Sequence, residues 1–235
     1  MTIVARVVVT GASGKTGGAI HEGLRDTYGH DVFGVDRNSG TDSMCDISDA
    51  EAFTNLIRHN AFGARAIIHA ALDTTIEYDQ SGRTDPKTQE MWRNVMRAAI
   101  ETDIDRIILC SSTHTDGRYK QPDCPPVLTP ILGEGHPTGM YAENKLRMER
   151  EAATFAEETG AKVIIPRLGG FRVDDSISTP ASWLSRRDMV NGLERCLTAD
   201  VEPGSAQVFY LLSENGPFDL TNGVGYMPQD SAHDR

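Results

Sequence analysis

The 235-residue chain has a formal net charge of −11, a sequence pI near 5.0 and no block of Lys or Arg, which argues against nucleic acid or an anionic membrane as its main partner. Its four cysteines are scattered without a C-x-x-C pair, so we expect neither a zinc site nor a disulfide framework. No apolar segment approaches the length that spans a bilayer and no secretory pattern is present, so we expect a soluble cytoplasmic protein.

The first predicted strand, residues 6–10, leads into a glycine-rich turn and then into a helix. Glycines let the backbone turn tightly and approach a ligand, and a helix N-terminus offers free N–H groups to phosphates. The alternative is a strand–helix turn that binds nothing. A P-loop is excluded, because that motif needs a glycine five positions before Gly14, where the chain has Val9. The predicted pyrophosphate site comprises Gly11, Ser13, Gly14, Lys15, Thr16 and Gly17.

The second predicted strand, residues 31–35, ends at Asp36, 19 residues beyond Gly17. An acidic residue at about 20 residues from the glycines is expected to hold the adenosine ribose hydroxyls of a dinucleotide. Its carboxylate would repel the 2′-phosphate of NADP, so NAD is the expected cofactor, although the neighbouring Arg37 could partly offset that repulsion.

Three further elements follow: a helix over 48–60, a strand over 66–70 and a helix over 87–102, with a loop over 78–86. Asp46 and Ile47 suit the edge of an adenine pocket, although Asp46 could equally cap the first of these helices. Ala70, Ala71 and Leu72 end the strand, where small residues allow a cofactor to lie against the backbone. His69 is expected in the core.

The predicted strand over 105–110 ends in a cluster of hydroxyls and one imidazole, and a Pro- and Gly-rich loop over 115–138 precedes a charged helix over 141–159. Tyr141 and Lys145 are four residues apart, so their side chains share one face of that helix. An ammonium near a phenol favours the phenolate, which predicts a lowered pKa for Tyr141 and proton removal from an alcohol near neutral pH. Ser112 could then hydrogen-bond the reacting oxygen. A chance surface pair is the alternative, and the glycine turn and Asp36 argue against it.

The remaining predicted elements are a strand over 162–168, a capped helix over 185–197, a strand over 207–212 and a polar tail over 226–235 that we expect to be partly disordered. Strands that alternate with helices predict an α/β fold, doubly wound around a mostly parallel, Rossmann-type sheet. We expect one domain, residues 1–235, in which the segments from about residue 168 onward form the substrate side.

The chain resembles the short-chain dehydrogenase/reductase superfamily, and more closely its extended, epimerase/dehydratase-like branch. The matching pieces are Thr10-Gly-Ala-Ser-Gly-Lys-Thr-Gly17, Asp36, Asp46-Ile47, His69-Ala-Ala71, Ser111-Ser112 and Tyr141-x-x-x-Lys145. The resemblance implies NAD(P) binding, a catalytic triad of Ser112, Tyr141 and Lys145, and a homo-oligomer. It also implies that Lys145 and Leu168 contact the cofactor.

Within that branch the chain looks most like uronate dehydrogenases, which oxidise the C1 hydroxyl of hexuronic acids to lactones with NAD. Residues 111–114, 182–188 and 225–232 echo three of their motifs. Carried over by position, Thr74, Thr113 and His114 would face the sugar together with Ser112 and Tyr141. Thr113 replaces an asparagine of that family. The arginine that clamps the uronate carboxylate is missing before Trp183, and Arg172 is a candidate substitute.

The sequence therefore predicts an NAD-dependent oxidoreductase for a sugar-type hydroxyl, in a uronate or in a related aldose, sugar phosphate or polyol. Three alternatives stay open. One is a sugar or sugar-nucleotide epimerase or dehydratase with bound NAD. The second is a reductase that works in the opposite direction, and the third is a non-catalytic dinucleotide-binding sensor.

Overall fold

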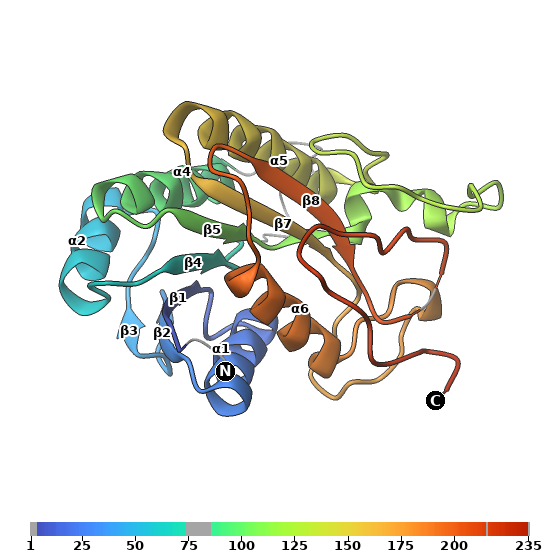
Figure 1. Cartoon of the computed structure of the whole chain (residues 1–235), viewed down its shortest axis with the longest axis horizontal. Helices are drawn as coiled ribbons and strands as arrows, with labels where there is room; N and C mark the ends of the chain where they lie inside the picture. The colour runs from blue at the N-terminus through green and yellow to red at the C-terminus, as the bar shows by residue number, and fades with distance from the viewer. Residues whose placement is uncertain (1–3, 74–85, 215, 235) are drawn as a thin grey trace.

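The computed structural model describes residues 4–73, 86–214 and 216–234, and its centre is an eight-stranded sheet (Figure 1). The described strands pair in parallel in the order β3-β2-β1-β4-β5-β7-β6, with β8 on the other side of β7. Cys110 separates β5 from β6, and both pair with β7. The strands are β1 (Arg6–Thr10), β2 (Asp31–Asp36), β3 (Ser43–Met44), β4 (Ala66–His69), β5 (Arg106–Leu109), β6 (Ser111–Ser112), β7 (Lys162–Leu168) and β8 (Ala206–Leu211).

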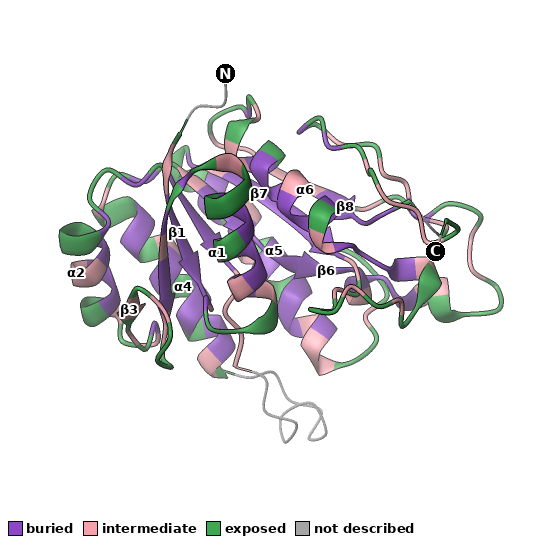
Figure 2. Ribbon diagram, turned by 90° about the horizontal axis from the view of Figure 1, so that it is seen from below, coloured by how far each residue is buried: buried purple, intermediate pink, exposed green. Residues whose placement is uncertain are grey.

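Helices cover both faces of this sheet. On one face lie α2 (Ala50–Asn60), α4 (Pro86–Glu101) and α5 (Met140–Thr159), and on the other lie α1 (Lys15–Tyr28) and α6 (Arg186–Thr198) (Figure 1). Phe53 and Trp92 belong to the hydrophobic core under the first group, and Ile20 and Leu193 to the core under the second. The central strands β1, β4, β5 and β7 are almost wholly buried between them (Figure 2). The predicted doubly wound, parallel α/β fold is confirmed.

The strand order indicates which edge of the sheet binds a ligand. The chain moves from β1 outward to β2 on one side, then returns to pair β4 with β1 on the other. In open α/β sheets, ligands bind outside the carboxyl ends of the strands at such a reversal. The sequence analysis missed β3, because two residues carry no periodic signal.

The Pro- and Gly-rich stretch over 115–138 is not featureless. It contains the end of the 3₁₀ helix η1 (Thr113–Thr115) and all of η2 (Gly117–Lys120), and a third 3₁₀ helix, η3 (Pro180–Ser182), follows β7. Leu128 N donates a hydrogen bond of 2.6 Å to the carbonyl oxygen of Pro217, and Leu128 packs with Tyr210 and Phe218 in a small separate core. The C-terminal part of the chain therefore holds this loop in place. That the segments from about residue 168 onward form the substrate side stays a prediction.

The C-terminal tail packs against the fold, so the expectation of partial disorder over 226–235 is wrong for the described residues up to 234. Tyr226 is buried, and its hydroxyl donates a hydrogen bond of 2.6 Å to the Leu212 carbonyl oxygen. The buried carboxylate of Asp188 accepts hydrogen bonds from Gln229 N at 2.7 Å and from Asp230 N at 3.1 Å. Helix α6 therefore supplies the acceptor for backbone N–H groups of the tail.

Candidate active site

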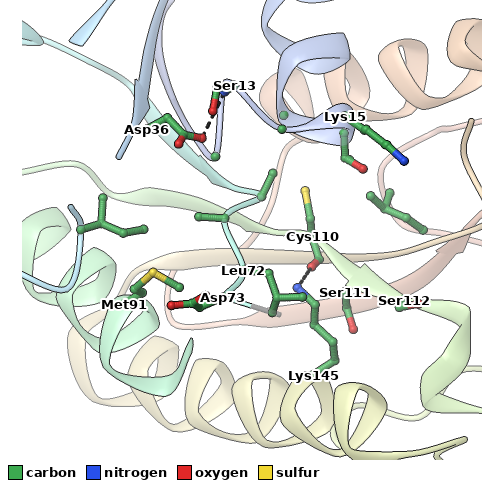
Figure 3. A pocket seen from close by; sticks show the side chains of 18 of the residues that line it. Ser13, Lys15, Asp36, Leu72, Asp73, Met91, Cys110, Ser111, Ser112 and Lys145 are labelled. Atoms are coloured by element: carbon green, nitrogen blue, oxygen red, sulfur yellow. Dashed lines mark hydrogen bonds between the residues drawn. The ribbon is translucent and has the colours of Figure 1, made fainter. Parts of the chain in front are cut away.

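A cleft of about 640 Å³ runs along the carboxyl ends of the strands, from the end of β2 to the end of β7. Helix α1 begins in its wall, and α5 contributes residues from its first two turns (Figure 3). Clefts of this size accommodate small-molecule ligands. Each predicted cofactor residue lines it: Gly11, Ser13, Gly14, Lys15, Thr16, Gly17, Asp36, Arg37, Asp46, Ile47, Ala70, Ala71, Leu72, Lys145 and Leu168.

The glycine turn brings the end of β1 against the end of β4. Gly11 has a φ of +74°, and a Cβ built there would lie 2.7 Å from the Ala71 backbone. A Cβ on Gly17 would lie 2.1 Å from the Gly11 carbonyl oxygen. Gly14 caps α1 without a side-chain hydrogen bond, so the first-turn N–H groups of the helix stay available to a ligand. This cradle fits the pyrophosphate of a dinucleotide.

Asp36 ends β2 with its carboxylate oriented by neighbouring backbone. Its oxygens accept hydrogen bonds from Ser13 N at 3.1 Å and from Asn38 N at 2.9 Å (Figure 3 shows the first). The Asn38 side chain also donates to Asp36 through Nδ2, at 3.2 Å. A carboxylate has about four lone-pair sites, so acceptor capacity is left for a ribose hydroxyl. The donor set of the cleft thus fits the adenosine half of a dinucleotide as well as its phosphates.

Asp46 lies beside the same end of the cleft but does not cap α2, whose cap is Asp49 with a 3.0 Å hydrogen bond from Ala52 N. Burial acts to raise the pKa of Asp46, but hydrogen bonds from Ser48 and the charge of Lys87 outweigh it and hold that pKa at about 2. Asp46 is therefore a permanent anion in the lining, and the predicted helix-cap alternative for this residue is wrong.

Three polar side chains meet where β5 and β6 end: Ser112, Tyr141 and Lys145. Ser112 is hydrogen-bonded to Tyr141. Lys145 donates a hydrogen bond of 2.7 Å to the Cys110 carbonyl oxygen, drawn in Figure 3, and its Nζ lies 6.0 Å from the centroid of the Tyr141 ring. Topology explains the meeting, because α5 packs against β6 and β7. A hydroxyl, a phenol and an ammonium thus share one wall of the cleft.

Burial governs the ionisation of this trio. It lowers the pKa of Lys145 to about 8. It also raises the pKa of Tyr141 above its ordinary value, although the hydrogen bond with Ser112 acts in the opposite direction. The prediction that Lys145 would lower the pKa of Tyr141 is therefore wrong for this structure, because loss of hydration at the buried phenol dominates its ionisation.

His114 also reaches the cleft, with its ring edge-on to that of Tyr141 at a centroid distance of 6.0 Å and an interplanar angle of 85°. Its Nδ1 is 2.8 Å from the Thr138 hydroxyl oxygen. Burial, together with the charge of Lys120, lowers the pKa of His114, so the imidazole is held neutral. A neutral imidazole can both donate and accept hydrogen bonds, as sugar hydroxyls require.

Two other predicted substrate residues, Thr113 and Arg172, are not brought to this place. Thr113 is buried outside the cleft lining, and its hydroxyl has no partner among the described residues. Arg172 is exposed outside the lining, with its Nε 3.7 Å from Asp174. Thr74 lies outside the described residues. The lining as described contains one arginine, Arg37, at the opposite end from Tyr141.

Several lining residues were missed by the sequence analysis. Asp73 directly follows Leu72, and Gly169 and Gly170 directly follow β7, so the rule that ligands lie at strand carboxyl ends could have found them. Met91, which comes from inside α4, gave no signal. The full set missed is Val35, Asn38, Cys45, Asp73, Met91, Cys110, Ser111, Gly169, Gly170 and Phe171. Over the described parts of the chain, no group of three or more His, Cys, Asp or Glu is arranged to hold a metal ion.

Comparisons with known proteins bear on the family and on the fold of the chain. The profile of the NAD dependent epimerase/dehydratase family matches residues 7–171. The chain is 26% identical to the L-arabinose 1-dehydrogenase (NAD(P)(+)) of Haloferax volcanii, over 97% of this chain and 98% of that one. It is 24% identical to the NAD-dependent glucose-6-phosphate dehydrogenase of the same organism, over 96% and 94%. Its fold is similar to that of uronate dehydrogenase from Agrobacterium tumefaciens, with a TM-score of 0.76 and 24% identity over 98% of this chain and 86% of that one.

Proposed function

The chain belongs to the NAD dependent epimerase/dehydratase family, and from that premise we propose that it is a sugar dehydrogenase that oxidises the C1 hydroxyl of an aldose to a lactone with NAD. The observation that carries the proposal is the meeting of Ser112, Tyr141 and Lys145 at one end of a cleft whose other end fits a dinucleotide. The dehydrogenase names of its relatives support the oxidation of a sugar.

Residues of the chain hold the cofactor in the proposed complex. The glycine turn and the start of α1 bind the pyrophosphate, and Asp36 accepts hydrogen bonds from the adenosine ribose. Lys145 lies at the nicotinamide end. NAD, when bound, supplies the acceptor for the hydride that leaves C1.

The chain itself moves the proton. Tyr141, as phenolate, takes the proton of the C1 hydroxyl, and Ser112 donates a hydrogen bond to the oxygen that becomes the carbonyl. The ammonium of Lys145 stabilises the phenolate by its charge. Because burial raises the pKa of Tyr141, the resting phenol is protonated at neutral pH, so the reaction depends on that ammonium.

The substrate is proposed to be a neutral or phosphorylated aldose. Among the described residues near Tyr141, the cleft offers no arginine that could clamp a uronate carboxylate. His114, held neutral and edge-on to Tyr141, is placed to orient a neighbouring sugar hydroxyl. The names of two relatives, for L-arabinose and for glucose 6-phosphate, support sugars without a carboxylate.

NAD is proposed over NADP because Asp36 would repel a 2′-phosphate.

The cytoplasm is the proposed compartment, because the four cysteines are free in the structure and free thiols persist where the environment is reducing. No helix in the described segments is long and apolar enough to cross a membrane.

The proposal is tested by following NADH formation at the absorbance of the reduced nicotinamide. The panel contains L-arabinose and other neutral aldoses, glucose 6-phosphate, galacturonate and glucuronate, each with NAD and with NADP. We expect turnover with a neutral or phosphorylated aldose and little with the uronates. Turnover confined to uronates would contradict the proposed substrate. No turnover with any sugar, although dinucleotide binds, would contradict the proposed reaction.

A further inference from the structure

Four charged side chains from different elements form a chain of contacts at the adenosine end of the cleft. Arg37 donates hydrogen bonds from Nη1 and Nη2 to the two carboxylate oxygens of Asp73, at 3.1 and 3.4 Å. Lys87 Nζ lies 3.8 Å from Asp73 and donates to Asp46 at 3.0 Å. Arg37, Asp73 and Asp46 all line the cleft, as does Asp36.

The two side chains of the Arg37–Asp73 pair differ in their exposure to solvent. The Asp73 side chain is 13% exposed, whereas that of Arg37 is 52% exposed. A fixed carboxylate therefore holds a guanidinium that is otherwise free to move into solvent. Such half-exposed pairs contribute little to the free energy of folding, so the pair is a weak stabilising element. The pair instead fixes the position of the Arg37 guanidinium, because both terminal nitrogens of Arg37 face Asp73.

This position matters because Arg37 directly follows Asp36. An arginine beside the ribose-binding acid can accommodate the 2′-phosphate that distinguishes NADP from NAD. Guanidinium groups bind phosphate best through two parallel hydrogen bonds, the same pair of donors that Asp73 now occupies. A 2′-phosphate would have to displace Asp73 before Arg37 could bind it through this pair of nitrogens.

We infer that Asp73 is a coenzyme-specificity residue, which favours NAD by withholding Arg37 from a 2′-phosphate. The inference rests on the proposed function, since it needs a dinucleotide in this cleft. Asp36 acts by repelling the phosphate directly, and it is held by Ser13 and Asn38 instead of Arg37. Asp73 acts through Arg37, from the end of a different strand.

The test is direct binding, measured by titration calorimetry, of ADP-ribose and 2′-phospho-ADP-ribose, neither of which can be turned over. The quantity compared is the ratio of their dissociation constants. Asp73→Asn removes the charge that holds Arg37 and keeps the side-chain shape, so we expect this ratio to shift about tenfold toward the phosphorylated ligand, equivalent to about 1.4 kcal/mol. The shift should shrink as salt increases, because the released Arg37 is exposed.

Two further variants separate the inference from a general charge effect. Asp26→Asn removes an exposed carboxylate that pairs with Arg25 outside the cleft lining, and we expect it to leave the ratio nearly unchanged. The double variant Arg37→Gln/Asp73→Asn should lose the shift of the single variant. A shift that survives in the double variant, or one of equal size in Asp26→Asn, would overturn the inference, as would no shift in Asp73→Asn. A wild-type protein that binds neither ligand would overturn the proposed function and this inference with it.

Discussion

Lys145 donates a hydrogen bond of 2.7 Å to the carbonyl oxygen of Cys110, at the point where β5 ends. The bond holds the ammonium of a helical residue against the sheet, 6.0 Å from the centre of the Tyr141 ring. Burial lowers the pKa of Lys145 to about 8 and raises that of Tyr141 above its ordinary value. Because the pKa of Lys145 lies below that of Tyr141, the pH dependence of the proposed reaction can be predicted.

The first prediction concerns the pH dependence of sugar oxidation. The reactive form has Tyr141 as phenolate and Lys145 as ammonium, and it carries one proton fewer than the fully protonated pair. Its population rises with pH until Lys145 titrates at about 8, then stays level until Tyr141 titrates as well. We expect kcat/KM to rise about tenfold per pH unit below 8 and to level off above it. A profile that is flat between pH 6 and 8 would contradict this assignment.

Lys145→Met supplies the second prediction. Without the ammonium, Tyr141 must reach its phenolate form unaided, and its pKa is already raised by burial. We expect kcat/KM to fall by about 10² to 10⁴ and to keep rising through pH 8 without levelling off. A pH profile of kcat/KM for the variant measures both the fall in rate and the loss of the plateau. If the variant still levelled off near pH 8, another group would be responsible for the wild-type plateau.

The third prediction concerns a buried ion pair next to the site. Glu149 accepts hydrogen bonds from Arg167 at 3.0 and 2.8 Å, from the Ser111 hydroxyl at 2.6 Å and from Gly133 N at 3.1 Å. Its side chain is 0% exposed and that of Arg167 is 1% exposed. Glu149→Gln leaves the guanidinium charge buried without its counter-charge, so we expect the free energy of unfolding to fall by about 3–5 kcal/mol. Urea unfolding measures it.

The matched control lies on the same helix. Glu151 pairs with Arg93 at 2.8 Å, and the side chain of Arg93 is 53% exposed. Glu151→Gln should therefore change the free energy of unfolding by no more than about 1 kcal/mol. Equal effects of the two variants would show that the burial of Glu149 does not set its contribution.

The fourth prediction concerns the tail. Removing the Asp188 carboxylate leaves Gln229 N, Asp230 N and the Ser213 hydroxyl without their acceptor. Asp188→Ala should lower the free energy of unfolding by about 2 kcal/mol or more and should speed proteolytic cleavage within 226–234. Asp200→Ala, on the surface after α6, should do neither. Unchanged proteolysis in Asp188→Ala would contradict the proposed docking contact.

The parts of the site that could be predicted from sequence are those that depend on short spacings. The glycine turn, Asp36 and the pair of Tyr141 with Lys145 each follow from local geometry, and the parallel sheet brings them to one edge. The pairs Arg37–Asp73 and Glu149–Arg167 join different elements, so no spacing in the sequence indicates them.

Burial explains the remaining differences. Tyr141 was expected to have a lowered pKa because sequence shows the neighbouring ammonium but not the loss of hydration. Thr113 was expected to face the sugar because it stands where uronate dehydrogenases have an asparagine, yet η1 turns it into the interior. The tail was expected to be partly disordered because its sequence is polar, and its acceptor, Asp188, lies on another element.

Tyr141→Phe tests the central claim most directly, because it removes one oxygen atom from the wall of the cleft. With NAD and the best sugar of the panel, we expect the rate of NADH formation to fall by about 10² to 10⁴, the usual contribution of a general base, while calorimetry still detects ADP-ribose binding. Tyr119→Phe, whose ring packs on Phe218 at a centroid distance of 5.2 Å outside the cleft lining, should retain the wild-type rate. A Tyr141→Phe variant that keeps the wild-type rate would contradict the proposed role of Tyr141 in proton removal.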